Sequence, residues 1–169
     1  MNQIAVLTIT RNEKHFFPRW IDHYASVGDL YVLDHESDDG STADGHGYFR
    51  VRVENPCTDN VLWMRNLIHE RMNILLKGYK TVVFAEVDEY LIPEPAIYDS
   101  LRDYIEERDT DRLLTATGYE IVPDGLWCRT DAYDKTLIVR QPVRWVPGFH
   151  RVEKPTSVPG PDPHLFLVH

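Results

Sequence analysis

Short apolar runs, each the length of a buried strand, recur along the chain between polar loops. They are rich in β-branched residues and bounded by turn formers, which is typical of strands buried inside a sheet. The runs are IAVLTI (residues 4–9), LYVLD (30–34), KTVVFAEVDEYLI (80–92), LLTATGYEIV (113–122), TLIVR (136–140) and HLFLV (164–168). The alternating stretch YFRVRVE (48–54) predicts one more strand.

Three other segments repeat their apolar residues at helical spacing. Residues 17–24 carry them at i, i+3, i+4 and i+7, residues 59–77 carry a longer apolar stripe, and residues 97–105 carry a shorter one. Helices between apolar strands are the signature of an α/β fold. We therefore predict a single α/β domain over residues 1–169, with a mostly parallel central sheet flanked by helices.

The composition narrows the class of protein. Hydrophobic residues make up 43% of the chain and charged residues 27%, as in ordinary globular domains. The net charge of -9 argues against a nucleic-acid partner, because phosphate backbones need a basic surface. Neither a signal peptide nor an apolar run of the ~18–20 residues that span a bilayer is present. We expect no transmembrane segment and a cytoplasmic location, either free or peripheral at the inner face of the membrane.

Polar clusters coincide with three of the predicted strands. TRNE (10–13) follows the first strand, DHESDDGS (34–41) follows the second, and EVDE (86–89) lies within the run 80–92. In α/β sheets, ligands bind in the crevice at the carboxyl ends of the strands. The pattern therefore predicts one acidic ligand site at one edge of the sheet.

The acids of the run 80–92 indicate a cation at that site. Alternate residues of a strand share a face, so Glu86 and Asp88 are expected to point one way and Glu89 the other. Two carboxylates on one face repel each other unless a cation lies between them. Oxygen ligands suit Mg²⁺ or Mn²⁺, which complete their shell with phosphate and water. A solvated strand end is the alternative, although the apolar run resumes at Tyr90.

The remaining chemistry is less specific. Asp34 ends a buried strand, where a carboxylate can accept a ribose hydroxyl or a base N–H, but its loop is also rich in plain turn formers. The patterns GxxxxGK[ST], GxGxxG and HExxH are absent. A lone His is more often structural than a ligand. His150 and His169 are the stronger candidates, because they flank a proline-rich segment that can fold back over the sheet edge.

Three segments together resemble a glycosyltransferase of the GT-A fold, in the family-2-like bacterial group and the related family 92. They are TRNEKHFFPRWIDHYASVG (10–28), DHESDDGST (34–42) and EVDEYL (86–91). Members of these families carry a KNE or RNE triplet, a DNDSTDGT-type loop and a DVDEFL-type strand end. The order and spacing agree over roughly residues 4–93, more than half of the chain.

The resemblance implies a nucleotide-sugar donor, a glycan or other hydroxyl acceptor, and a role in polysaccharide biosynthesis. Residues 1–93 would hold the nucleotide-sugar and the metal, and residues 94–169 would hold the acceptor. The residues implied for the donor are Thr10, Asn12, Glu13, Asp34, Glu36 and Glu86. The residues implied for a divalent metal, Mn²⁺ or Mg²⁺, are Asp88, Glu86 and either His150 or His169. Glu86 departs from the family, which has Asp there.

The second half of the chain is expected to supply a general base. An inverting transfer, which is inferred from the family alone, needs a carboxylate to remove the proton of the acceptor hydroxyl. Glu120 and Asp124 are the candidates, with a solvated loop as the alternative for each. Trp127, Trp145 and Phe149 are candidates to stack on a sugar ring, but core packing is the more usual role of an aromatic residue.

Two other classes of function stay open. One is a non-catalytic nucleotide- or sugar-binding module, because 169 residues are few for a complete GT-A enzyme. The chain would then be a fragment, or a minimal domain that relies on a partner. The other class is a nucleotidyltransferase, which usually has a glycine-rich basic loop after the first strand. TRNEKHF has no glycine, so this class is disfavoured.

Overall fold

The computed structural model describes residues 3–43, 47–54, 61–108, 113–123, 125–131, 134–146, 152 and 160–169, which alternate between strands and helices. The helices are α1 (Phe17–Tyr24), α2 (Val61–Leu75) and α3 (Leu101–Glu107). The strands are β1 (Ile4–Thr10), β2 (Asp29–Asp34), β3 (Tyr48–Arg52), β4 (Thr81–Phe84), β5 (Tyr90–Pro93), β6 (Leu113–Ile121), β7 (Trp127–Arg129), β8 (Lys135–Val139) and β9 (Asp162–Val168).

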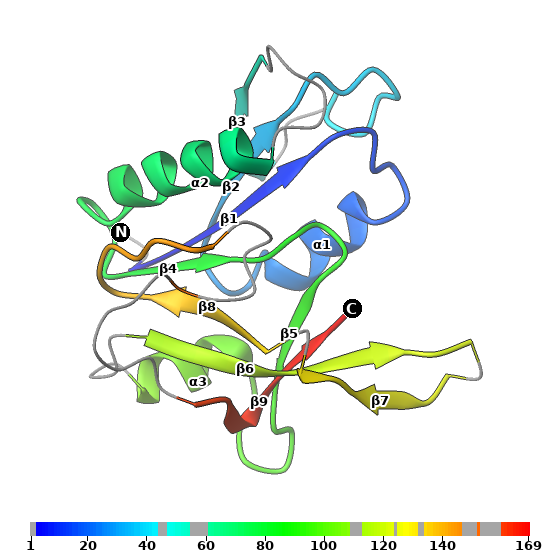
Figure 1. Cartoon of the computed structure of the whole chain (residues 1–169), viewed down its shortest axis with the longest axis vertical. Helices are drawn as coiled ribbons and strands as arrows, with labels where there is room; N and C mark the ends of the chain where they lie inside the picture. Colours follow the sequence, from blue (N-terminus) through cyan, green and yellow to red (C-terminus); the bar gives the residue numbers. More distant parts are fainter. Residues whose placement is uncertain are drawn as a thin grey trace.

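One mixed sheet holds the domain together. Its order is β3-β2-β1-β4-β8-β6-β9-β5, and β7 pairs with β6 in a hairpin that projects from the sheet (Figure 1). The pairings make six of the nine described strands (β1, β2, β3, β4, β6 and β9) run one way and three (β5, β7 and β8) run the other way. The predicted α/β domain with a mostly parallel sheet and flanking helices is confirmed.

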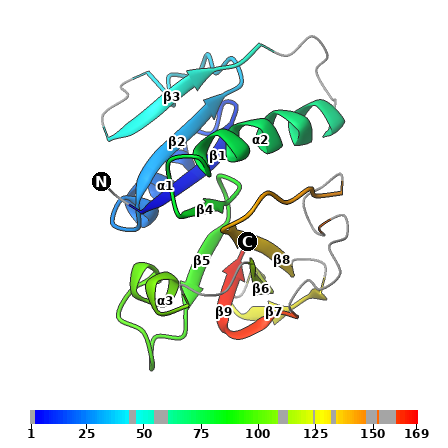
Figure 2. The same ribbon diagram turned by 90° about the vertical axis from the view of Figure 1, so that its left-hand side faces the viewer.

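Helices cover both faces of the parallel half of the sheet (Figure 2). Tyr48 and Phe49 are neighbours in β3 and so point to opposite faces. Phe17 of α1 packs edge-on against Tyr48, with ring centroids 5.3 Å apart. Phe49 stacks on Tyr31 of β2, whose ring contacts that of Tyr79, just after α2. Because both faces are covered, β1 and β4 in the middle of the sheet are buried along nearly their whole length, whereas β3 at its edge is mostly exposed.

The prediction of one strand over residues 80–92 is wrong in its middle. β4 ends at Phe84, residues 85–89 form a turn, and β5 begins at Tyr90 and pairs with β9. Strand alternation therefore does not set the directions of Glu86 and Asp88. The apolar residues on either side belong to two strands of opposite direction, the buried β4 and the partly buried β5, and the acids lie where the chain passes from one to the other.

Two further predictions for the second half need correction. Ile97 lies outside α3 and is 55% exposed, so it is not part of the apolar face of that helix. Trp127 lies on β7 and is 48% exposed, so it does not serve core packing, whereas Trp145 is fully buried. Phe149 lies outside the described residues.

Candidate functional site

A cleft opens at the carboxyl ends of β1, β2 and β4. Its volume is about 240 Å³, and it is lined by Ile9, Thr10, Arg11, Glu13, His35, Met64, Glu86, Val87 and Asp88. All three polar clusters of the sequence contribute residues to the lining of the cleft, and α2 contributes Met64. β2, β1 and β4 are adjacent and parallel, so their carboxyl ends meet at one edge. The predicted convergence of the polar clusters is therefore observed.

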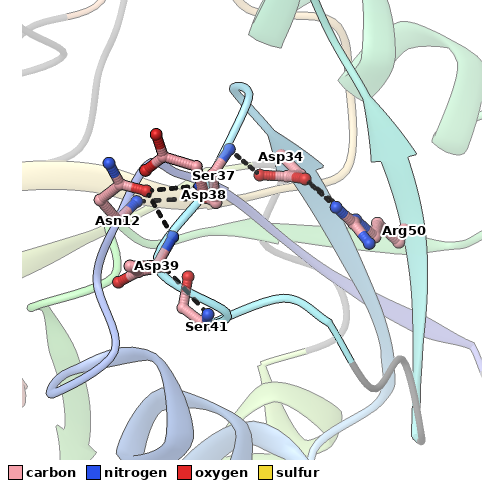
Figure 3. Close-up of polar contacts among 7 residues, drawn as sticks. All are labelled: Asn12, Asp34, Ser37, Asp38, Asp39, Ser41 and Arg50. Carbon is pink, nitrogen blue, oxygen red and sulfur yellow. Dashed lines mark hydrogen bonds and ion pairs between the residues drawn. The ribbon is translucent and has the colours of Figure 1, made fainter.

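Asn12 joins the first cluster to the second (Figure 3). Its side-chain Oδ1 accepts hydrogen bonds from the backbone N–H groups of Asp38, at 2.9 Å, and Asp39, at 3.4 Å. Its own N–H donates to Ser37 Oγ at 3.1 Å. The residue has a positive φ of 58°, which Asn tolerates better than most side chains. Asn12 is not among the residues that line the cleft, so what the structure shows is a role in holding the loop after β2.

Asp34 at the end of β2 is fully buried (Figure 3). Its Oδ1 accepts the backbone N–H of Ser37 at 3.0 Å, and its Oδ2 accepts both Nε, at 3.0 Å, and Nη2 of Arg50 in β3. Burial would raise the pKa of the Asp34 carboxyl, but the Ser37 and Arg50 donors outweigh it and hold the pKa below its ordinary value. Neither Asp34 nor Glu36 lines the cleft, so their contacts with a base or ribose stay predictions.

A buried lysine lies behind the turn 85–89. Lys135 at the start of β8 is 2% exposed, and its Nζ donates to Glu86 Oε2 at 2.7 Å and to Glu89 Oε1. Glu89 is fully buried, so its carboxylate carries the largest desolvation penalty of these three charged groups. We name Glu86, Glu89 and Lys135 the buried ion cluster. Sequence reasoning missed Lys135, whose only signal is a charge directly before the apolar run TLIV.

The turn is also tied by its own backbone and by α1. The N–H of Glu86 donates to Glu89 Oε2 at 3.1 Å, and the N–H of Glu89 donates to the carbonyl of Glu86 at 3.0 Å. Tyr24 of α1 donates its hydroxyl to the carbonyl of Glu89 at 3.1 Å and accepts the N–H of Leu91 at 3.0 Å. These bonds hold the backbone on both sides of Asp88, so the fold defines where this residue lies in the turn.

The protonation of Glu89 gives the stability a pH dependence of defined sign. Burial, opposed by Lys135 and reinforced by Glu86, raises the pKa of Glu89 to about 7 from its ordinary value of 4.5. Between these values the folded chain holds a proton that the unfolded chain releases. The free energy of unfolding should therefore fall as pH rises from about 4.5 to about 7, by on the order of 3 kcal/mol.

Urea unfolding of the wild type and of Glu89→Gln between pH 4.5 and 8 measures this contribution. The stability of the wild type relative to the variant should decrease as the pH rises across this window, because Gln does not titrate. A difference between the two proteins that stays constant with pH would contradict the raised pKa.

Asp88, which lines the cleft, contacts His169, which is not among the lining residues. Asp88 Oδ2 lies 3.2 Å from His169 Nε2, and the two side chains are 40% and 36% exposed. The backbone of His169 is anchored to β6, because its N–H donates to the carbonyl of Tyr119 and its carbonyl accepts the N–H of Ile121, each at 3.1 Å. His169 is thus brought beside the predicted metal ligand, whereas His150 lies outside the described residues.

A carboxylate and an imidazole together suit Mn²⁺, which accepts both oxygen and nitrogen ligands. Among the described residues, no group of three or more His, Cys, Asp or Glu side chains is placed to hold an ion. Asp88 and His169 can therefore supply two ligands, and the rest of the shell would come from phosphate oxygens and water. Glu86 already binds Lys135 through one oxygen. The chemistry of the donor set fits a divalent metal of this kind.

The predicted general bases are less well placed. Glu120 is an exposed residue of β6, opposite Cys128 of β7, and it does not line the cleft. It does lie between Tyr119 and Ile121, which hold the backbone of His169. Asp124 lies outside the described residues. The roles of both residues stay predictions.

Comparison with known proteins gives similarity at the level of structure only. No protein-family model and no curated protein match the sequence. S. aureus TarS 1-349 in complex with UDP-GlcNAc matches over 82% of this chain and 45% of that chain, with a TM-score of 0.49 and 13% identity. Mannosyltransferase PcManGT from Pyrobaculum calidifontis, in complex with GDP-Man and Mn2+, matches over 69% of this chain and 35% of that chain, with a TM-score of 0.42 and 14% identity.

The first of these structures contains UDP-GlcNAc, and the second is a mannosyltransferase with GDP-Man and Mn2+. The chain spans less than half of the length of either one. With identities of 13% and 14% and TM-scores of 0.49 and 0.42, the similarity assigns no activity to this chain. Separately, none of the helices within the described ranges is long and apolar enough to cross a membrane.

Proposed function

We propose that this chain is a metal-dependent glycosyltransferase domain that moves a sugar from a nucleoside-diphosphate sugar to a hydroxyl acceptor. The observation that carries the proposal is the contact of His169 with Asp88, a residue that lines the cleft at the carboxyl ends of β1, β2 and β4. This edge is where α/β sheets bind nucleotides. Two metal ligands beside such a cleft suit a diphosphate, which brings its own oxygen ligands to the ion.

Asp88 and His169 would hold Mn²⁺ or Mg²⁺, with Glu86 as a further predicted ligand. When bound, the ion would act as a Lewis acid on the leaving diphosphate. The acceptor oxygen forms a bond to the anomeric carbon while the bond from that carbon to the diphosphate oxygen breaks. The proton of the acceptor hydroxyl passes to a carboxylate, for which Glu120 and Asp124 are the candidates. Inversion of the anomeric centre is part of the proposal.

A non-catalytic nucleotide-binding module is the second candidate. The observation in its favour is that Glu120, the one candidate base that is described, does not line the cleft. Such a module would use the same edge of the sheet and the same metal ligands, but it would turn over no sugar nucleotide.

Nucleoside diphosphates should stabilise the protein, and only when a divalent metal is present. A ligand at 100 times its Kd adds about 2.7 kcal/mol of stability, which raises the Tm of a domain of this size by about 5–10 °C. A thermal-shift screen of UDP, GDP, CDP and ADP with Mn²⁺, with Mg²⁺ and with EDTA measures this effect.

The same samples, supplied with nucleotide sugars, are then assayed for release of nucleoside diphosphate. Metal-dependent stabilisation with turnover supports the transferase, and stabilisation without turnover over a broad set of acceptors supports the module. Stabilisation that is the same in EDTA would remove the metal from the proposal. No stabilisation under any of these conditions would overturn both candidate functions.

A further inference from the structure

Two side chains of α1 bind the outer edge of β5. This strand is the last in the order of the sheet, and β9 is the strand that pairs with it. His23 Nε2 lies 3.0 Å from the carbonyl oxygen of Leu91, and the hydroxyl of Tyr24 accepts the N–H of Leu91 at 3.0 Å. Because a carbonyl oxygen only accepts, His23 carries a proton on Nε2 and donates it.

The register of β5 on β9 explains why Leu91 needs these partners. In an antiparallel pair, successive residues direct their N–H and C=O groups alternately toward the partner strand and away from it. The N–H of Glu94 faces β9, because it donates to the carbonyl of His164 at 2.8 Å. Leu91, three residues earlier, therefore faces away from β9, and Pro93, which also faces away, has no N–H to satisfy. Leu91 is fully buried, so α1 takes the place of a neighbouring strand for it.

Tyr24 also reaches the turn that carries Asp88. Its hydroxyl donates to the carbonyl of Glu89 at 3.1 Å, so one oxygen atom joins the residue after Asp88 to the second residue of β5. Burial raises the pKa of Tyr24, so the hydroxyl keeps the proton that it donates. The two hydrogen bonds together hold the backbone at the place where the turn becomes a strand.

Ring contacts hold His23 and Tyr24 in their own positions. The ring of His23 packs edge-on against those of Tyr24 and Tyr90, with centroids 4.6 Å and 5.3 Å away. Tyr24 is fully buried, and its ring lies 5.0 Å from that of Trp20. The packed pair of side chains therefore restrains the backbone from which the Asp88 carboxylate projects.

We propose that His23 and Tyr24 are positioning residues for Asp88, which hold the backbone of its turn so that the carboxylate is presented to a divalent metal. The inference rests on the proposed function and deepens it, because it says what sets the affinity for the ion. A ligand whose backbone is already held loses less conformational entropy when the ion binds. Sequence reasoning missed this role, because helical spacing indicates only a core position for Tyr24 and nothing for His23.

Tyr24→Phe removes the hydroxyl and keeps the ring. With a nucleoside diphosphate present, the Mn²⁺ concentration that gives half-maximal nucleotide binding should rise about tenfold, as when a group that supports a metal ligand is lost. Tyr79→Phe is the matched control, because the Tyr79 hydroxyl also has two partners, Asp29 Oδ2 at 2.8 Å and the hydroxyl of Tyr31 at 2.9 Å. Asp29 is the first residue of β2, at the end of the sheet away from the cleft. Both variants should melt about 4–10 °C below the wild type, but Tyr79→Phe should need no more Mn²⁺.

Two changes at His23 test the other hydrogen bond. His23→Phe keeps a ring against Tyr24 and Tyr90 and removes the donor to Leu91, whereas His23→Gln offers an amide N–H near the position of Nε2. His23→Phe should raise the Mn²⁺ requirement about tenfold, and His23→Gln should stay within about twofold of the wild type. The titrations are done at a temperature where circular dichroism shows that every variant is folded. A His23→Gln protein as impaired as His23→Phe would overturn the role of this N–H.

The decisive measurement is the effect of Tyr24→Phe in an Asp88→Asn background. If Tyr24 acts through Asp88, its loss should change the Mn²⁺ requirement by less than about twofold once the carboxylate is gone. An equal loss in both backgrounds, or a Tyr24→Phe protein that needs no more Mn²⁺ than the wild type, would overturn the positioning role alone. A wild type that shows no metal-dependent nucleotide binding would overturn the proposed function as well.

Discussion

Replacing Asp88 by Asn is expected to weaken Mn²⁺-dependent binding of a nucleoside diphosphate by about 10–100-fold, with the fold intact. The carboxylate is 40% exposed and contacts His169, so its loss should cost the folded state little. An amide has the same shape but no charge, and a divalent ion needs charged oxygen ligands when few protein groups bind it. Calorimetry with Mn²⁺ and the best nucleotide of the thermal-shift screen measures the loss.

Two comparisons make the Asp88 result specific. Asp22→Asn makes the same substitution at an exposed residue of α1, and this variant should bind Mn²⁺ and the nucleotide as the wild type does. His169→Ala should lose metal-dependent affinity in the same direction as Asp88→Asn, because the two side chains are in contact. An Asp88→Asn protein that binds metal and nucleotide as tightly as the wild type would remove the central residue of the proposed site.

The polar edge of the sheet could be predicted because short segments of the sequence specify each strand and the polar loop after it. The apolar runs before Thr10 and Asp34 are short, β-branched and followed by turn formers, and parallel strands place their carboxyl ends together. The direction of each strand then brings the loops to one cleft without any knowledge of side-chain contacts. The same reasoning gave the helix over residues 17–24, whose Phe17, Trp20 and Tyr24 are buried.

The contacts that hold the site together are long-range, and no spacing in the sequence encodes them. Lys135 meets Glu86 and Glu89 from 49 and 46 residues away, because β8 pairs beside β4. His169 reaches Asp88 because β9 joins the sheet between β6 and β5. These placements follow from the order of strands in the sheet, which the apolar pattern does not specify.

The misread strand 80–92 has a similar origin. The rule that successive side chains point to opposite faces holds only within a strand, and the acids at 86–89 lie in a turn. Glu89 can be buried there because it forms an ion pair with the ammonium of Lys135, and Glu86 pairs with the same ammonium. Glu86 and Glu89 therefore share one cation in the fold, and the role of Glu86 as a metal ligand stays a prediction. Asp88 differs from the other two in facing His169 instead of Lys135.

Replacing Lys135 by Met should destabilise the fold by about 3–5 kcal/mol, the usual cost of removing one partner of a buried ion pair. Met keeps most of the length of the side chain and removes its charge. Glu89 is then left fully buried without a cation, and Glu86 loses its partner. The cost should be smaller at pH 5 than at pH 8, since a protonated Glu89 needs no counter-ion. Urea unfolding at both pH values measures it.

The double variant Lys135→Met with Glu89→Gln distinguishes two causes of the lost stability, the missing positive charge and the missing packing contacts of Lys135. If the cost arises from the unpaired buried carboxylate, removing that carboxylate should restore a large part of the stability, so the two changes are strongly non-additive. Lys77→Met, at an exposed lysine just after α2, should stay within about 0.5 kcal/mol of the wild type. A double variant that is as unstable as the sum of its single changes would show that Lys135 stabilises the turn through packing, and the electrostatic account of the buried ion cluster would fail.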